Sequence, residues 1–239
     1  MPNVFKEMEQ LRHLYLPYDY WVSDKLELGN LCYLQTLLNV GPKTIKMPTS
    51  FRFDYLRILG ILYQVDGEGP HLVQILVSSC PHIYELYVNY RIKKLLETHQ
   101  FSSNLVKLDL RRTCLEEDPM PILEKLPNLK ILHLIESTFS RKDMVCSEGG
   151  FHLLQFLLLE RLYSLEEWRV EEGAMPSLCR LEIEFCNSLK VIPDGLRFIT
   201  TLQKLKIKSM SKSFTNRLHE GGPDFDKVKH VPSLVFIDW

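Results

Sequence analysis

One pattern of apolar and polar positions recurs along the whole chain. Aliphatic residues occupy the first, fourth and sixth places of a short motif, Leu-x-x-Leu-x-Leu, and variable residues stand between them. The clearest copies begin at Leu105, Leu129, Leu154, Leu178 and Leu202. Because side chains alternate along a strand, the fourth and sixth places share one face, and the third, fifth and seventh places share the other. Each copy therefore predicts a short, half-buried β-strand.

The copies recur at a nearly constant spacing. Earlier copies begin at Leu11, Leu34, Leu56 and Ile83, and a partial last copy contains Leu234 and Ile237. From Leu11 to Leu202 the copies start about 24 residues apart, inside the 20–29 residue range of leucine-rich repeats. A single copy cannot bury its leucines alone, so the copies must stack. The pattern predicts an α/β fold: a curved leucine-rich repeat solenoid of about nine to ten repeats, with a concave parallel β-sheet and an irregular convex side of short helices and loops.

We expect one leucine-rich repeat domain over residues 1–239. Residues 1–10 lead into it, residues 11–208 form the repeats, and residues 209–239 form a C-terminal helix or loop and a capping strand. Asn39 stands where an inward aliphatic residue is expected, which predicts an irregular hinge in the concave sheet. The last spacing widens to 32 residues, which leaves room for a helix near Lys212 to Glu220, ended by Gly221 and Gly222.

Aromatic residues mark the early repeats. They stand at the outward places of the motif or one position beyond, at Tyr15, Tyr18, Tyr63, Tyr87 and Tyr90. Tyrosine is enriched at interaction surfaces because it buries area while its hydroxyl keeps a polar contact. The same residues could also be half-buried filler between strands, and the pattern favours neither interpretation.

The later repeats carry apolar and charged side chains at outward places. Exposed contiguous apolar groups at these places indicate an interface, with burial in the core as the alternative. The lysines of the ninth copy resemble an anion-binding stripe, but glutamates stand at matching positions of the eighth copy. Cross-strand pairing therefore favours a mutually neutralising ladder over a phosphate or RNA site. The candidate partner-binding residues are Ile131, His133, Ile135, Phe156, Leu158, Arg180, Glu182, Lys204, Lys206 and Lys208.

Composition narrows the class of protein. The chain has 45% apolar and 25% charged residues and a formal net charge of −1, so nucleic acid and anionic membranes are not expected as main partners. Its first ten residues contain no apolar signal region, and no apolar stretch approaches the roughly 20 residues of a membrane helix. Six scattered cysteines without a CxxC pair, and the lack of Asn-x-Ser/Thr acceptors, predict reduced, mostly buried thiols in a cytoplasmic protein.

Catalytic motifs are missing from the sequence. It contains no GxxxxGK[ST] or GxGxxG loop, no HExxH pair and no GxSxG nucleophile turn. Cys114 precedes three acidic residues, but nothing in the sequence places a histidine beside it, so we interpret it as a core residue. We expect no enzymatic activity, and no catalytic, cofactor-binding or metal site.

Several stretches resemble plant intracellular NLR immune receptors of the coiled-coil class. MEQLRHLYLP (8–17) resembles the start of their repeat region, and LPNLKILHL (126–134) and GGFHLLQFLLLERLYSLEEW (149–168) are similar to their middle repeats. Their last repeats and tail resemble MPSLCRLEIEFCNSLKVIPDGLRFITTLQKLKIKSM (175–210) and FTNRLHEGGPDFDKVKHVPSLVFIDW (214–239). The resemblance covers essentially the whole chain.

This resemblance implies a role in pathogen sensing. In that family the repeat region binds a pathogen effector, or a host protein that the effector alters. The early repeats hold a nucleotide-binding module in its inactive state, so the tyrosine-bearing repeats would face that module and the later repeats the effector. The sequence contains neither the coiled coil nor the nucleotide-binding module.

Three other classes of repeat protein are alternatives. A substrate-recognition module of a ubiquitin-ligase adaptor would need an F-box or similar helical module, which the sequence does not show. An extracellular receptor is disfavoured by the missing glycosylation acceptors, signal peptide and paired flanking cysteines. A catalytic ligase of the repeat class would need a separate catalytic domain, for which no length remains.

Overall fold

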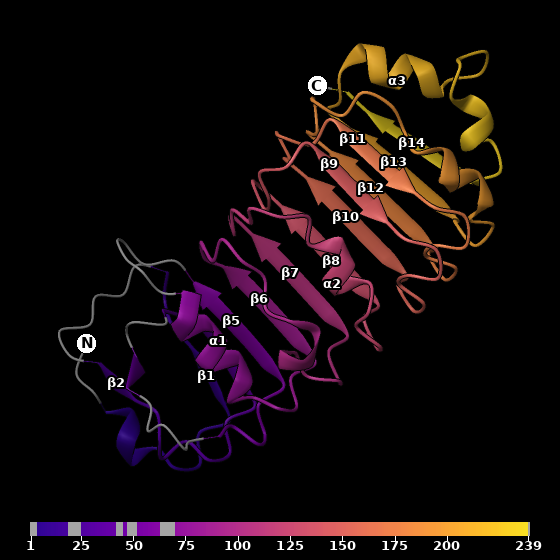
Figure 1. Ribbon diagram of the computed structural model, residues 1–239. Coiled ribbons are helices and arrows are strands. Elements are labelled where there is room, and N and C mark those ends of the chain that lie inside the picture. Colours follow the sequence, from indigo (N-terminus) through magenta and orange to yellow (C-terminus); the bar gives the residue numbers. More distant parts are fainter. Residues whose placement is uncertain (1–3, 19–24, 42–44, 47–51, 63–69, 239) are drawn as a thin grey trace.

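The computed structural model describes residues 4–18, 25–41, 45–46, 52–62 and 70–238, and its centre is a ten-stranded parallel sheet (Figure 1). Its strands follow one another in chain order, one for each motif copy: β1 (His13–Tyr15), β3 (Thr36–Val40), β5 (Ile58–Leu62), β6 (Glu85–Asn89), β7 (Lys107–Arg111), β8 (Ile131–Ile135), β10 (Phe156–Glu160), β12 (Arg180–Glu184), β13 (Lys204–Lys208) and β14 (Ser233–Ile237). This ladder of successive parallel strands confirms the predicted leucine-rich repeat solenoid.

The inward leucines form one continuous core. Leucines at the fourth place pair in register across the sheet, and those of the central repeats have no solvent-exposed surface: Leu108, Leu132, Leu157, Leu181 and Leu205. Burying such a side chain contributes about 1.5–3 kcal/mol. Because each leucine packs against copies in the repeats before and after it, stacking stabilises units that could not fold alone.

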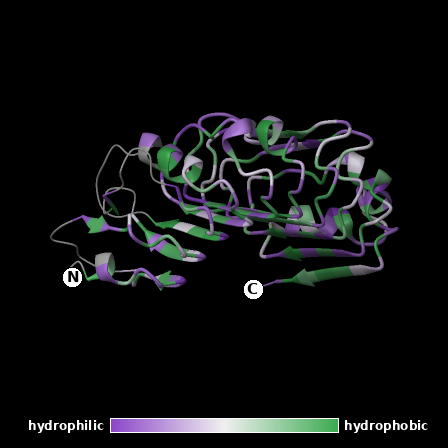
Figure 2. Ribbon diagram, turned by 90° about the horizontal axis from the view of Figure 1, so that it is seen from below, coloured by the Kyte–Doolittle hydropathy of each residue, from purple (hydrophilic) through white to green (hydrophobic). Residues whose placement is uncertain are grey.

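The sheet is arched, and its two faces differ. Viewed edge-on in Figure 2, helices and loops cover the outer side of the arch. The described part of the chain places no helix over the concave face. The side chains at the third, fifth and seventh places of each motif point to this face, and those that are not buried by their neighbours are available to a partner.

Short elements make up the convex side. Two small parallel pairs, β2 (Leu26–Glu27) with β4 (Ile45–Lys46) and β9 (Asp143–Cys146) with β11 (Glu167–Val170), run behind the main sheet. The helices are α1 (Pro70–Ser78) and α2 (Met120–Leu123), with 3₁₀ turns η1 (Phe5–Glu7), η3 (Thr98–Gln100) and η4 (Asp194–Phe198). The irregular convex side that the sequence predicts is confirmed.

The expected irregularity at Asn39 is a β-bulge in β3. Leu37 pairs with Leu59, but the next inward pair joins Val40 to Ile61, so β3 has one extra residue. Asn39 adopts a left-handed conformation with φ of 61°, and its Nδ2 donates to the Leu16 carbonyl at 2.8 Å. Val40, which is fully buried, takes the inward place that the regular motif assigns to Asn39.

The C-terminal region contains the expected helix, but the last motif copy is shifted. Helix α3 (Lys212–Leu218) begins at Ser211, which accepts a hydrogen bond from the Phe214 amide, and the chain turns at Gly221, with φ of 83°. A 3₁₀ turn, η5 (Phe225–Lys227), leads on to β14. In β14, Leu234 pairs with Leu205 and Phe236 pairs with Ile207.

The expectation that Leu234 starts the last copy and that Ile237 points inward is therefore wrong. By this register the copy begins at Val231, and Ile237 is an exposed outward residue. The helix inserted before β14 lengthens the spacing to this copy, so the regular period of the earlier repeats does not identify its first residue.

The six cysteines are free thiols, as expected, but only three of them are buried. Cys80, Cys146 and Cys186 pack in the core, and burial raises the pKa of Cys146 and of Cys186 to about 12. Cys32 and Cys179 are exposed, so the expectation of mostly buried thiols holds for only half of the set. Among the described residues, no helix has the length and apolar character needed to cross a membrane.

Candidate interaction surface

Parallel pairing without stagger aligns the outward side chains into rows that run across the strands. From β6 to β13, each residue at the third place lies beside the third-place residue of the next strand, and the same holds for the fifth and seventh places. The third-place row reads Glu85, Lys107, Ile131, Phe156, Arg180 and Lys204. Residues 24 or so positions apart in sequence thus form one continuous surface.

Three of the four predicted apolar residues lie on this surface. Ile131, Phe156 and Leu158 are half-buried, and Ile131 pairs with Phe156 in the sheet. Ile135 is different, because it is only 3% exposed and belongs to no exposed patch. It is the last residue of β8, and the following turn folds back against it, with Thr138 Oγ1 donating to its carbonyl at 2.8 Å.

Polar groups surround the ring of Phe156. The His133 ring packs edge-on against it at 5.1 Å between centroids, and the Arg180 guanidinium lies 4.5 Å from its centroid. Such a cation over an aromatic face contributes about 0.5–1 kcal/mol at exposed sites. Phe156 is therefore held in place before any partner arrives.

His133 is a polar side chain set into the apolar part of the surface. Its Nδ1 lies 3.3 Å from Oδ2 of Asp109 on the preceding strand, and Asp109 also lies 3.9 Å from Arg111. The other ring nitrogen, Nε2, is buried and has no hydrogen-bond partner. Asp109 fixes the orientation of the His133 ring next to Phe156.

The charged residues of β12 and β13 form the predicted ion-pair ladder. Lys206 Nζ lies 2.7 Å from Glu184 and 3.3 Å from Glu182, Lys208 Nζ lies 3.3 Å from Glu184, and Arg180 pairs with Glu182. Burial opposes ionisation of Glu184, but the hydrogen bonds and charges of Lys206 and Lys208 outweigh it and hold its pKa below the ordinary value. The bond from Glu184 in turn raises the pKa of Lys206. Both shifts favour the charged forms of Glu184 and Lys206.

Lys204 lies outside this ladder. It is half-buried at the third place of β13, between Arg180 and Ser233, and neither neighbour carries a negative charge. Within the described part of the chain, no ion pair includes its ammonium group. The predicted neutralisation is thus incomplete at this position.

The early tyrosines differ in their exposure to solvent. Tyr15 and Tyr18 are 63% and 68% exposed. Tyr87 is half-buried: its hydroxyl donates to Glu85, and Lys107 lies 5.0 Å from its ring centroid. Burial, followed by the hydrogen bond to Glu85, raises the pKa of Tyr87.

Two members of the tyrosine series do not stand on the described surface. Tyr90 is only 3% exposed, because it follows the end of β6 at the eighth place, where the alternation points it into the core. Tyr63 lies outside the described residues. The intramolecular surface predicted from this series therefore keeps Tyr15, Tyr18 and Tyr87.

Sequence reasoning missed a row of side chains at the rim where the strands end. In five successive repeats the eighth-place residue adopts a left-handed conformation, with φ of 48–56°: Arg112, Glu136, Arg161, Phe185 and Ser209. Arg112 pairs with Glu136 at 2.7 Å, and Arg161 and Lys208 lie 4.6 and 5.5 Å from the Phe185 ring centroid. The signal that could have found them is their position: each stands at the eighth place of its motif copy, directly after the last outward residue of the strand.

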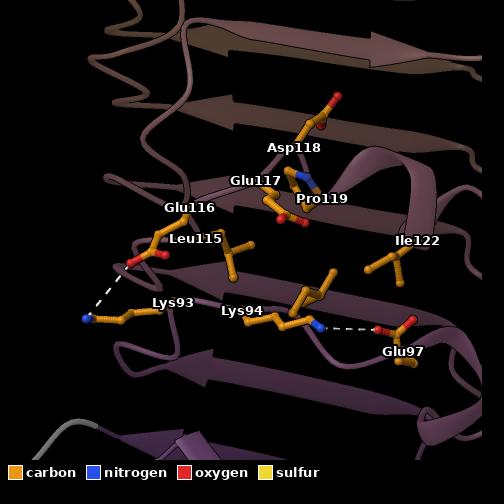
Figure 3. Close-up of a pocket in the computed structure, with 10 residues that line it drawn as sticks. Lys93, Lys94, Glu97, Leu115, Glu116, Glu117, Asp118, Pro119 and Ile122 are labelled. Carbon is orange, nitrogen blue, oxygen red and sulfur yellow. Dashed lines mark ion pairs between the residues drawn. The ribbon is translucent and has the colours of Figure 1, made fainter.

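A pocket of about 330 Å³ lies on the convex side of the solenoid, between the segments that follow β6 and β7 (Figure 3). Its charged walls pair with one another, Lys93 with Glu116 at 3.9 Å and Lys94 with Glu97 at 3.7 Å. Asp118 accepts hydrogen bonds from the Met120 and Val145 amides, and burial raises its pKa despite them. The acidic run after Cys114 therefore includes a residue that joins two convex-side segments.

In the described ranges, no group of three or more His, Cys, Asp or Glu side chains could hold a metal ion. The candidate interaction surface is the concave face from β6 to β13, where aromatic and charged side chains lie together. Its side chains are fixed by neighbours on adjacent strands, and its scaffold is the rigid repeat core.

The chain has relatives among known proteins. The chain is 41% identical over its whole length to an Arabidopsis thaliana protein named as a disease resistance protein, At1g59780, of which it covers 28%. It is 37% identical over its whole length to disease resistance protein RPP8 of Arabidopsis thaliana, of which it covers 29%. The chain is a leucine-rich repeat homologue of plant disease resistance proteins.

A third relative agrees with this. Disease resistance protein RPH8A of Arabidopsis thaliana is 36% identical to this chain over 96% of the chain's length, and the match covers 28% of RPH8A. The chain thus spans less than a third of the length of these curated relatives. No family model matches the chain. These relatives agree with the resemblance to plant disease resistance proteins that the sequence shows.

Proposed function

We propose that this chain is the non-catalytic sensor region of an intracellular plant immune receptor, and that its concave face from β8 to β13 binds a pathogen effector or a host protein that an effector modifies. The observation that carries the proposal is homology, over the whole chain, to plant disease resistance proteins. The exposed concave face, with its fixed aromatic and charged side chains, supports this position for the contact.

The early repeats have a different role in this proposal. Tyr15, the last residue of the first strand, and Tyr18, three residues after it, are exposed and dock against the nucleotide-binding module of the full-length receptor. This contact restrains the module until a partner occupies the later repeats. Two large exposed aromatic side chains at one end of a solenoid support a protein–protein contact at that end.

Substitutions on the concave face test the recognition part of the proposal. Phe156→Ala removes the ring that His133 and Arg180 pack against, and Arg180→Glu reverses a charge that is 48% exposed at its side chain. In the full-length receptor, assayed for the defence response to its effector in leaf tissue, both variants should abolish the response while protein levels stay unchanged. Tyr163→Ala, an exposed aromatic residue in the loop after β10, is the control and should respond normally. A normal response from both concave variants would overturn the assignment.

The tyrosine pair tests the restraint part. The double variant Tyr15→Ala/Tyr18→Ala should give a defence response without effector, because the contact that holds the module inactive is lost. The matched control is Tyr33→Ala/Tyr55→Ala, an exposed and mutually packed tyrosine pair with ring centroids 5.7 Å apart. A Tyr15→Ala/Tyr18→Ala receptor that stays silent without effector would show that these residues do not restrain the module.

A further inference from the structure

Carboxylates and cations lie at different depths in the ladder of β12 and β13. The side chains of Glu182 and Glu184 are 6% and 9% exposed, and that of Glu160 on β10 is 20% exposed. The carboxylates of this region therefore lie close to the sheet, and little of their surface is accessible to an approaching molecule.

The cations cover the carboxylates and face the solvent. Arg161 and Arg180 have side chains 38% and 48% exposed, and those of Lys206 and Lys208 are 21% and 36% exposed. Each of these cations is more exposed than any of the three carboxylates, although they pair with one another. Lys204 adds a further ammonium group that no ion pair within the described part of the chain includes. We call these five residues the cationic strip.

Apolar side chains border the cationic strip on both sides. Phe156 and Leu158 stand on β10, and Val235 and Ile237 stand at outward places of β14. The pairing register aligns them with the strip, so that one row reads Leu158, Glu182, Lys206 and Val235. Since neighbouring strands lie about 4.8 Å apart, the two apolar borders are separated by about 14 Å.

We propose that the cationic strip binds an acidic segment of the partner protein, with carboxylates over Lys204 and Lys206 and aliphatic side chains over the two apolar borders. This inference rests on the proposed function and names the chemistry of the partner. An extended segment advances about 3.3 Å per residue, so two side chains about four positions apart, the ends of a segment of about five residues, span the distance between the borders. A short sequence with acidic residues in the middle and an aliphatic residue at each end matches the strip.

The same observations disfavour nucleic acid as the occupant. Five cations face three carboxylates, a small excess, whereas nucleic-acid binding draws its affinity from many phosphate contacts. The apolar borders would also meet a polar backbone on both sides. A protein segment satisfies the charges and the borders together.

Lys204 gives the sharpest test of the strip. Because no ion pair within the described residues includes its ammonium group, Lys204→Glu reverses a charge without breaking the ladder beneath it. Lys125→Glu is the matched control, an exposed lysine just after α2 on the convex side. Thermal unfolding should give the same midpoint for both variants and the parent chain, and Lys204→Gln serves as a milder variant at the same position.

The probe is a synthetic peptide that contains Leu-Glu-Glu-Glu-Leu twice, compared by fluorescence anisotropy with its Leu-Gln-Gln-Gln-Leu counterpart; in an extended segment the two leucines of each unit share one face about 13 Å apart. The acidic peptide should bind the whole chain, the glutamine peptide should bind at least about tenfold more weakly, and added salt should weaken the acidic complex. Lys204→Glu should weaken binding of the acidic peptide by about tenfold, one reversed charge contact, and Lys125→Glu should leave it unchanged.

Four outcomes would overturn the inference: no binding of the acidic peptide, equal binding of the glutamine peptide, no effect of Lys204→Glu, or tighter binding of a single-stranded RNA of equal charge. These outcomes are separable from failure of the proposed function. If the peptide fails but Phe156→Ala and Arg180→Glu still abolish the defence response, only the acidic chemistry is wrong. If the peptide binds but those variants respond normally, the strip is not the effector site.

Discussion

At the scale of single residues, the backbone turn that ends each strand is the least expected feature. Five successive repeats place a non-glycine residue in the left-handed region there, a conformation that costs about 1–2 kcal/mol. Each turn returns a hydrogen bond to the next repeat, as when the Arg161 amide donates to the Glu184 carbonyl at 2.9 Å and the Phe185 amide donates to the Lys208 carbonyl at 3.0 Å. The cost is local, and the bonds that offset it lie between repeats.

Asn39 allows a direct test of such a position. Replacing it with leucine restores the regular motif in the sequence, yet Asn39→Leu should lower the free energy of unfolding by about 1–2 kcal/mol. Leucine tolerates the left-handed conformation poorly and cannot donate to the Leu16 carbonyl. Urea unfolding would measure the loss.

The comparison variant is Asn39→Gly, which keeps the backbone conformation and loses only the side-chain hydrogen bond. It should cost less than Asn39→Leu. If the leucine variant is instead the more stable one, then the motif, and not the bulge, determines the local structure.

At the scale of elements, the C-terminal cap depends on one buried carboxylate. Asp224 is 2% exposed and pairs with Arg217 of α3 and with Lys227 of η5, which lies 2.8 Å away. Lys227 also reaches Asp194 of η4 at 2.6 Å. Burial opposes ionisation of Asp224, but the two cations outweigh it and lower its pKa. These contacts connect α3 and η5 to the preceding repeat.

Removing this carboxylate should loosen the cap. Asp224→Ala removes the partner of Arg217 and leaves Lys227, whose side chain is only 11% exposed, with Asp194 as its remaining carboxylate. It should destabilise the cap by about 1.5–3 kcal/mol, the usual contribution of hydrogen bonds to a charged group. Asp226→Ala, two residues on, breaks an exposed pair with Lys229 and should cost about 0–1 kcal/mol. Hydrogen exchange over α3 and β14 would distinguish them: equal protection in both variants would mean that Asp224 does not hold the cap.

At the scale of the whole molecule, stability depends on the contacts between neighbouring repeats. In a solenoid each repeat packs only against the repeats before and after it, so a defect weakens its neighbours first. The fourth-place leucines form the longest such series, and Leu132 on β8 stands in its middle without exposed surface. The arch of the sheet, and so the shape of the concave face, rests on this series.

A cavity in the central repeat should show this coupling. Leu132→Ala should lower the free energy of unfolding by about 2–5 kcal/mol and speed amide exchange in β7, β8 and β10 together. Ile131→Ala removes the half-buried neighbour on the concave face and should have the smaller effect. Faster exchange confined to β8 alone would contradict coupling between repeats.

The repeat spacing in the sequence was enough to predict the solenoid, its parallel sheet and most of its core. The leucines repeat with one phase over many copies, and only stacking can bury them. The ion-pair ladder was also predictable, because Glu182 and Glu184 occupy the same motif places as Lys206 and Lys208. The prediction failed where the phase is interrupted, at Asn39 and before β14, since an inserted residue or helix shifts the count.

The sequence by itself therefore determined the scaffold and which side chains could face outward, because alternation along a strand is a local property. Only the tertiary structure decided how deep each of them lies. Ile135 and Tyr90 are buried by the turns and alternation at strand ends, and the carboxylates of the ladder lie beneath their cations. Depth depends on neighbours from other repeats, and it leaves Lys204 as the one ladder-edge cation without an ion pair within the described part of the chain.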